Sequence, residues 1–358
     1  SAIDALRIGD NVVWQVDTLS SYQRVIDAFV SQALSDERKL VYVRFGAHQP
    51  LIDESKHIII YEIDAEKGFE SFATDVYRMI EKEGTETFYV FDVLTELLNS
   101  WYSDLMIGNF FHVTCPFLYE LDTVAYFGLI RNAHTFTTIA TIRETTQLLL
   151  DAYQVENQFY IHPLKVWKRY SPTMFFPHNV AGEEVVPITS SAEASAIFST
   201  IRFGEERLDY WDMIFNAARE KLNADETIKN ALRDDLMLKI IGQDSRMIKL
   251  CQRYMTLEDI LLIQARTIGT GYIGGKSVGM LLARKIIEKE CGKDVSDQLE
   301  SHDSFYLGSD VFYTYIVQNG WWQLRTQQKT DEFYYTYGKE LKEKLKHGEF
   351  PDNIKEKF

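Results

Sequence analysis

The sequence predicts an α/β fold: a mostly parallel sheet with helices on both faces and antiparallel edge strands, then a helical connector and a last part that opens on a glycine-rich turn. Two observations favour this fold. In residues 1–134, short runs rich in β-branched and aromatic residues alternate with helical segments of roughly 10–15 residues, as in βαβ units. After residue 134, three strand-like runs follow one another with short turns, which favours antiparallel pairing.

The elements of this first part follow in order along the chain. Buried strands are predicted at 11–16, 40–45, 57–62, 87–92 and 109–114. Helices are predicted at 21–34, 68–83, 93–106 and 119–132. In the first helix Val25, Phe29 and Ala33 recur at helical spacing, and Gly84 is expected to end the second. The runs at 135–143, 145–153 and 157–169 are the predicted edge strands.

The second half of the chain is mostly helical. Helices are predicted at 191–199, 204–222, 225–240, 243–253 and 256–265, which together form a connector or small bundle. A glycine-rich turn and a helix follow over 266–291, and a short strand at 304–307 precedes further helical stretches. The predicted domains are therefore 1–185, 186–265 and 266–358.

Composition restricts the classes of partner. The 358 residues carry a formal net charge of −15, which repels phosphate backbones and anionic lipid headgroups, so neither nucleic acid nor a membrane is expected as a partner. No apolar run reaches the length of about 18 residues that a membrane-spanning helix needs.

The side chains that bind metals or form disulfides are scattered along the chain. Three cysteines lie far apart, without a Cys-x-x-Cys pair, and the histidines show no metal-ligand spacing, so we expect no disulfide framework and no metal site. A reducing, cytoplasmic location fits this pattern. The charged C-terminal end suggests a fragment of a longer protein, whose downstream domains would be partners of this chain.

The turn after the first strand lacks the features of a phosphate-binding loop. Residues 15–22 contain no glycine and no lysine, and Asp17 places a negative charge where a phosphate would lie. We expect an ordinary strand-to-helix turn with Thr18 or Ser20 as the helix N-cap. Asp92 closes a predicted strand as a magnesium-orienting carboxylate does, but we expect it to cap helix 93–106; a retained metal role is the alternative.

The order of strand, turn, helix, strand and Asp-ended strand resembles the RecA/KaiC family of ATPases. The stretches at 126–131, 145–153, 161–166 and 169–174 are similar to KaiC-like proteins as well. The resemblance implies a degenerate RecA-like domain over residues 1–185, in which ATP hydrolysis is lost because the phosphate-binding lysine is missing. Such a pseudo-ATPase module would serve regulation or assembly, and homo-oligomers are a further expectation.

The segment from Gly269 to Met280 carries the clearest functional pattern. Gly274 and Gly275 free the backbone for an unusual turn, and Lys276 lies at the start of a helix, where the dipole and free N–H groups favour an anion. Gly279 is expected to allow close packing of that helix. The spacing is not that of a phosphate loop that follows a strand, and a flexible hinge is the alternative.

Residues 274–282 resemble the start of the ATP-binding domain of the phosphoenolpyruvate synthase and pyruvate, phosphate dikinase family. The strand and helix signals at 304–312 stand where that family has a similar element, although the usual proline before Phe305 is absent. The resemblance implies a truncated, ATP-grasp-type subdomain in which Gly274, Gly275, Lys276 and Ser277 bind ATP.

The same resemblance implies the activity of the parent protein. The whole enzyme would use ATP and Mg²⁺ to transfer phosphate, through a phosphohistidine, to pyruvate or a related acceptor. The family's Arg-Ser-Ser segment and acidic magnesium ligands are not found, so no catalytic residue is expected here and the fragment alone is expected to be inactive. The alternative is a non-catalytic RecA/KaiC-like interaction or signalling module.

Overall fold

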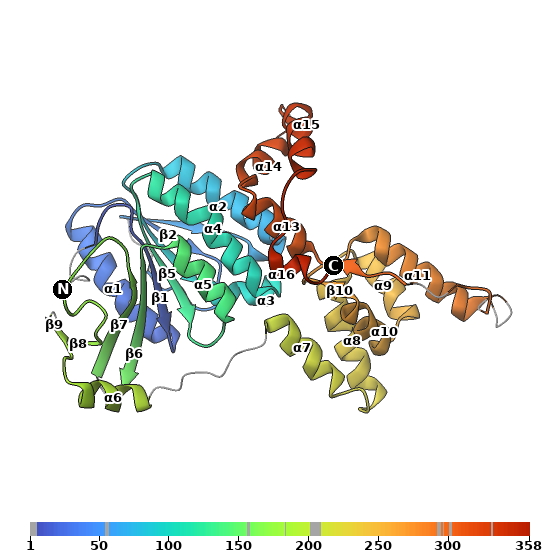
Figure 1. Ribbon diagram of the computed structural model, residues 1–358, viewed down its shortest axis with the longest axis horizontal. Coiled ribbons are helices and arrows are strands. Elements are labelled where there is room, and N and C mark those ends of the chain that lie inside the picture. The colour runs from blue at the N-terminus through green and yellow to red at the C-terminus, as the bar shows by residue number, and fades with distance from the viewer. Residues whose placement is uncertain are drawn as a thin grey trace. The chain divides into compact units, whose positions relative to one another are not determined.

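The structure is a computed structural model that describes residues 6–53, 57–155, 158–182, 184–200, 209–291, 295, 297–300, 303–330 and 332–358. The chain divides into two compact units, Ser1–Arg207 and Leu208–Phe358. Figure 1 shows the elements of each unit. Most of the predicted connector therefore belongs to the same unit as the glycine-rich turn.

The first unit is built on a nine-stranded sheet, counted over the described residues. Its strand order is β3-β2-β4-β5-β1-β6-β7-β8-β9. The strands are β1 Asn11–Val16, β2 Leu40–Arg44, β3 Ile58–Glu62, β4 Phe88–Val93, β5 Val124–Ile130, β6 Leu148–Val155, β7 Gln158–Val166, β8 His178–Ala181 and β9 Glu184–Pro187. Strands β1 to β6 are parallel and β7 to β9 are antiparallel to their neighbours, which confirms the predicted α/β fold with antiparallel edge strands.

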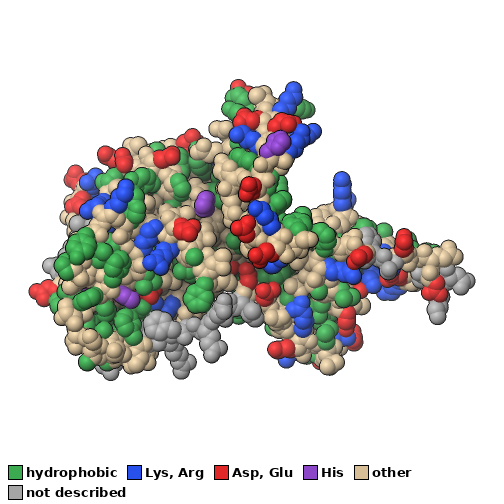
Figure 2. Space-filling view, in the orientation of Figure 1, with side chains coloured by type: hydrophobic (Ala, Val, Ile, Leu, Met, Phe, Trp, Pro, Cys, Tyr) green, Lys and Arg blue, Asp and Glu red, His purple; other side chains and the backbone are tan. Residues whose placement is uncertain are grey.

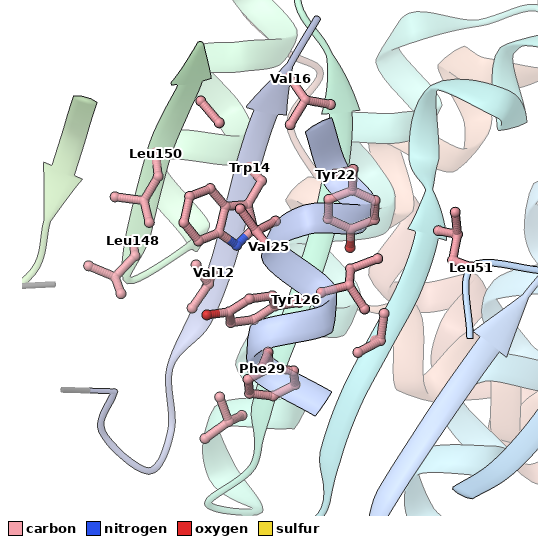
Figure 3. Packing of buried hydrophobic residues seen from close by; sticks show 14 of the residues in the cluster. Val12, Trp14, Val16, Tyr22, Val25, Phe29, Leu51, Tyr126, Leu148 and Leu150 are labelled. Atoms are coloured by element: carbon pink, nitrogen blue, oxygen red, sulfur yellow. The ribbon is translucent and has the colours of Figure 1, made fainter. Parts of the chain in front are cut away.

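Helices cover both faces of this sheet (Figure 1). They are α1 Leu19–Ser35, α2 Phe69–Glu83, α3 Leu98–Trp101, α4 Asp104–Glu120, α5 Phe136–Thr145 and α6 Ser191–Thr200, with short 3₁₀ turns η1 Ala65–Lys67 and η2 Leu94–Leu97. On one face, Tyr22, Val25 and Phe29 of α1 pack against Trp14 of β1 and Tyr126 of β5 (Figure 3). Burial of such side chains contributes roughly 1.5–3 kcal/mol each to stability.

The opposite face of the sheet packs against α4. Phe91 of β4 and Phe127 of β5 each come one residue after a side chain that packs on the α1 face, so they point to the opposite face. There they contact Phe110 and Phe111 of α4. This alternation follows from the two-residue period of a strand. A strand that is buried on both faces has a continuous run of apolar residues in its sequence. Such runs are easy to recognise, which explains why β2 and β4 were predicted from the sequence.

Three predictions in this unit are wrong. The predicted strand 109–114 lies within α4, the predicted helix 119–132 contains β5, and the predicted strand 135–143 is α5. Helix α4 buries side chains around most of its circumference, so its sequence shows no helical period. The seven apolar residues of β5 are too few for a helix of ordinary length, and the side chain of Thr135 caps α5 by accepting from Thr138 N.

The second unit contains the predicted helices. These are α7 Tyr210–Arg219, α8 Glu226–Ile240, α9 Ser245–Tyr254, α10 Leu257–Ala265, α11 Gly275–Glu290, α13 Ser309–Gln318, α14 Trp322–Gln328, α15 Tyr334–Leu345 and α16 Asp352–Lys355. The predicted helix 204–222 is confirmed only over α7, since residues 201–208 lie outside the described residues. Two short parallel strands, β10 Thr267–Ile268 and β11 Tyr306–Leu307, precede α11 and α13 respectively.

The surface carries charges of both signs. Figure 2 shows acidic and basic side chains interspersed on the visible face. Over the described residues, none of the helices is both long enough and apolar enough to cross a bilayer.

Candidate functional site

The carboxyl edge of a parallel sheet is the usual place for a ligand, so the turn after β1 is the first candidate. Strand β1 ends at Val16 and α1 begins at Leu19, which leaves a turn of only Asp17 and Thr18. The Thr18 hydroxyl accepts from Ser21 N at 3.2 Å and caps the helix. This confirms the prediction of an ordinary turn, because two residues cannot form a loop that surrounds a phosphate group.

A buried arginine occupies the space beside this turn. The Arg131 guanidinium, at the end of β5, forms ion pairs with Asp17 at 2.8 Å and with Asp151 of β6 at 2.9 Å, and donates to the Ala152 carbonyl at 2.7 Å. Arg131 is 9% exposed, and its guanidinium also lies 4.1 Å from the centre of the Tyr153 ring. The Asp17 charge is therefore paired with the charge of Arg131. This contact was not predicted from the sequence.

The side chain of Tyr22, in the first turn of α1, occupies the space between this helix and the sheet. The Tyr22 ring packs so closely over Gly128 of β5 that a Cβ atom there would lie 2.8 Å from the ring. The Tyr22 hydroxyl donates to the Phe91 carbonyl at 2.9 Å. Burial raises the pKa of Tyr22 well above its ordinary value, and the nearby Asp92 charge adds to this effect. Tyr22 and Arg131 therefore occupy the space beside the turn after β1 with buried side chains.

Asp92 does not cap a helix, contrary to the prediction. It lies inside β4, is fully buried, and accepts from Phe45 N at 2.9 Å and Gly46 N at 2.8 Å. The Tyr42 hydroxyl also donates to it. The carboxylate therefore holds the loop after β2 against β4, and both of its oxygens have protein donors. Over the described residues, no cluster of three or more His, Cys, Asp or Glu side chains has the arrangement of a metal site.

A buried histidine links three segments of the same edge. His134 Nδ1 lies 2.6 Å from Asp104 Oδ1, and its Nε2 lies 2.7 Å from the Thr95 hydroxyl. Because a carboxylate only accepts, Nδ1 donates to Asp104, and in the neutral ring Nε2 accepts from Thr95. Burial alone would raise the pKa of Asp104, but hydrogen bonds from His134 and Thr135 hold this pKa below its ordinary value.

This chain of groups has the order of a catalytic triad, but its hydroxyl is already engaged. Thr95 Oγ1 accepts from Ile130 N at 2.9 Å, which joins the segment after β4 to the end of β5. The arrangement therefore acts as a structural cross-link. His134 lies 30 residues from Asp104 and 39 residues from Thr95 along the chain, and no local sequence signal predicted this arrangement.

In the second unit, the predicted binding residues begin helix α11. Gly274 is the N-cap with φ +84°, in the left-handed region that favours glycine, and no side chain caps the helix. No acidic residue lies in its first turn. The four preceding helices differ, since a side chain caps each of them: Asp209, Asp225, Asp244 and Thr256. The first N–H groups of α11 are thus left without a side-chain acceptor from the N-cap.

The surroundings of these residues are open. Lys276 is exposed, Ser277 is half-buried, and no described atom lies within 4 Å of where a Cβ would stand at Gly274 or Gly275. The same holds for Gly279, so the prediction that Gly279 allows close helix packing is wrong. Together, Gly274 to Ser277 form an accessible helix N-terminus with a lysine and free backbone donors, which can hold an anion.

The segment before this helix is held by a contact that the sequence did not reveal. Asp310, in the first turn of α13, accepts from Thr270 N at 2.8 Å and from Thr270 Oγ1 at 2.7 Å. Ser309 Oγ accepts from Tyr272 N at 3.2 Å. The element predicted at 304–312 is confirmed as a short strand and a helix, and it borders the glycine-rich turn.

No protein-family model and no curated protein matches this chain. Its function is therefore inferred from its own residues and their geometry.

Proposed function

We propose that this chain is the N-terminal part of an ATP-dependent phosphotransferase of the phosphoenolpyruvate synthase or pyruvate, phosphate dikinase type. In this proposal the second unit contributes one part of an ATP-grasp-type site, and the N-terminus of α11 binds the phosphates of ATP. The observation that carries the proposal is the uncapped, exposed start of α11 with Lys276 in its first turn.

The physical basis is electrostatic. Free N–H groups and the helix dipole favour a negative charge at a helix N-terminus by roughly 0.3–1 kcal/mol, and by up to about 2 kcal/mol in partly buried sites. The Lys276 ammonium adds a mobile positive charge, and the positive φ of Gly274 sets the direction in which the first N–H groups point. These terms are small, so we expect this chain alone to bind ATP weakly.

The remaining parts of the activity belong to segments beyond this chain. Downstream domains of the same polypeptide would provide the other lobe of the site, the Mg²⁺ ligands, the phosphorylated histidine and the acceptor site for pyruvate or a related acid. The cytoplasm is the location we propose. The net charge of −15 supports the absence of a nucleic-acid partner.

For the first unit, we propose a RecA/KaiC-like fold that has lost its phosphate loop and serves regulation or assembly, including assembly of homo-oligomers. The position of β1 beside β6 supports a nucleotide-binding ancestry, because the chain leaves β1 toward β2 on one side of the sheet and leaves β6 toward β7 on the other. The two-residue turn after β1, the Tyr22 ring and the buried Arg131 support the loss of nucleotide binding.

The test is a calorimetric titration of residues 1–358 with MgATP. We expect Lys276→Ala to bind about tenfold more weakly than the wild type, since the lysine contributes on the order of 1.4 kcal/mol. Lys249→Ala is the matched control, because Lys249 is an exposed lysine on α9 of the same unit. Equal affinity in the wild type and Lys276→Ala would contradict the proposal.

A further inference from the structure

We propose that Asp310 is a positioning residue that fixes the glycine loop, residues 269–274, and thereby presents the N-terminus of α11 to an anionic phosphate group. The inference rests on the proposed function, since it concerns the same site. It assigns a role to the residues before Gly274, which the phosphate-binding interpretation leaves unexplained.

The first argument is the number of bonds that join two residues 40 positions apart. Asp310 Oδ1 accepts from Thr270 N at 2.8 Å, and Asp310 Oδ2 accepts from Thr270 Oγ1 at 2.7 Å. In addition, Asp310 N donates to Thr270 O at 3.3 Å. Asp310 is 3% exposed and Thr270 is 9% exposed. In so buried a place the two donors of Thr270 would lose their hydrogen bonds if the loop moved away.

The second argument is steric. A Cβ atom at Gly269 would lie 2.3 Å from Asp310 Oδ1, one at Gly271 would lie 2.5 Å from Ser309 Oγ, and one at Gly308 would lie 2.1 Å from Thr270 O. Glycines on both segments therefore permit the close approach of the loop to the start of α13. Gly269 and Gly271 also have positive φ angles, of +81° and +84°.

The third argument is the path from this contact to Lys276. After Thr270, the Tyr272 amide donates to Ser309 Oγ at 3.2 Å, and the Ile273 amide donates to the Ile240 carbonyl of α8 at 3.1 Å. Gly274 follows directly as the N-cap of α11. The backbone is thus held up to the residue before the N-cap, so the direction of the first N–H groups is fixed before any ligand arrives. Such pre-organisation reduces the cost of binding.

The experiment compares Asp310→Ala with Asp310→Asn. Alanine removes both acceptors, whereas asparagine keeps one acceptor for Thr270 N and places an amide donor opposite the Thr270 hydroxyl, which can accept. We expect Asp310→Ala to speed hydrogen exchange of the amides at 270–273 and to weaken MgATP binding about tenfold, and Asp310→Asn to restore both. Asp303→Ala, which removes an exposed carboxylate near β11, is the control.

The outcomes separate this inference from the proposed function. If the wild type binds MgATP, Lys276→Ala weakens binding and Asp310→Ala leaves affinity unchanged, the positioning role is refuted while the phosphate site stands. If the wild type does not bind MgATP, the proposed function fails, and the positioning role fails with it.

A second variant covers the case in which Asp310→Ala does not fold. Thr270→Val removes one donor with little change in volume, and Thr270→Ser retains it. We expect weaker MgATP binding for the valine variant and near wild-type binding for the serine variant, although only the serine variant loses a methyl group. Equal affinities in the two folded variants would overturn the inference, because MgATP binding would then not depend on the hydrogen bond that the Thr270 hydroxyl donates to Asp310.

Discussion

At the scale of single residues, Arg131 joins two carboxylates at the carboxyl edge of the first sheet. The guanidinium lies where the sheet ends, and it pairs with the half-exposed Asp17 and the buried Asp151. Burial raises the pKa of Asp151, and the charge of Arg131 opposes this rise. The cation that the turn after β1 lacks in sequence is thus supplied from β5, but as part of a closed network.

This network predicts a large cost for removing its cation. Arg131→Met should lower the free energy of unfolding by about 3–5 kcal/mol, because it leaves the buried Asp151 charge without its cation, held only by hydrogen bonds from Gln15 and Tyr153. Urea denaturation followed by fluorescence measures this change. The control Asp17→Asn removes only a half-exposed partner and should cost about 1 kcal/mol or less. A loss of similar size in both variants would show that burial of Asp151 does not set the cost.

The Asp310 carboxyl predicts a pH dependence of stability. Burial raises the pKa of Asp310 from 3.8 to about 6, although hydrogen bonds from Thr270 oppose the rise. The folded chain therefore holds this proton more tightly than the unfolded chain. The resulting stability is fully present below about pH 4 and is lost as the pH rises through about 6, a difference of about 3 kcal/mol.

Asp310→Asn isolates this contribution, since the amide does not titrate. Between pH 4 and 7 the wild type should lose stability relative to Asp310→Asn, as measured by denaturation at a series of pH values. A constant difference across this range would show that the carboxyl does not titrate as its burial implies. The protonated acid and the amide can form the same two bonds with Thr270, which agrees with the expected rescue by asparagine.

At the scale of elements, the sequence predicted what depends on neighbours along the chain. The capped turn after β1 and the start of α11 follow from Thr18 and from the glycines beside Lys276, all of them local signals. Helix α4 was missed because burial on most of its faces erases the helical period. The roles of Asp92 and Asp310 were missed because their partners lie more than 35 residues away.

Two glycine-to-alanine variants test whether the surroundings of a glycine in the structure, rather than the sequence pattern, set the effect of an added Cβ atom. Gly128→Ala should destabilise the first unit by about 1–3 kcal/mol, because its Cβ would lie 2.8 Å from the buried Tyr22 ring. Gly279→Ala should stabilise the second unit by up to about 1 kcal/mol, because the site is helical and open. Thermal unfolding measures both changes, and a destabilised Gly279→Ala would restore the close-packing role that the sequence suggested.

At the scale of the whole molecule, each unit offers one candidate nucleotide site, and the two differ in charge and access. In the first unit the carboxyl edge of the sheet is filled by Tyr22 and by ion-paired side chains. In the second unit an exposed lysine stands beside backbone donors that lack a side-chain cap. The structure confirms the α/β fold that the sequence predicted, whereas the binding site at Gly274 to Ser277 stays a prediction, and the contacts of Arg131 and Tyr22 join segments that lie far apart along the chain.

Hydrogen exchange of residues 1–358 with and without MgATP is the most direct test of this contrast, because it locates the ligand as well as detecting it. We predict slower exchange at the amides of Gly275, Lys276 and Ser277 and no change at residues 17–22. Protection at the turn after β1, with unchanged exchange at the start of α11, would contradict the account.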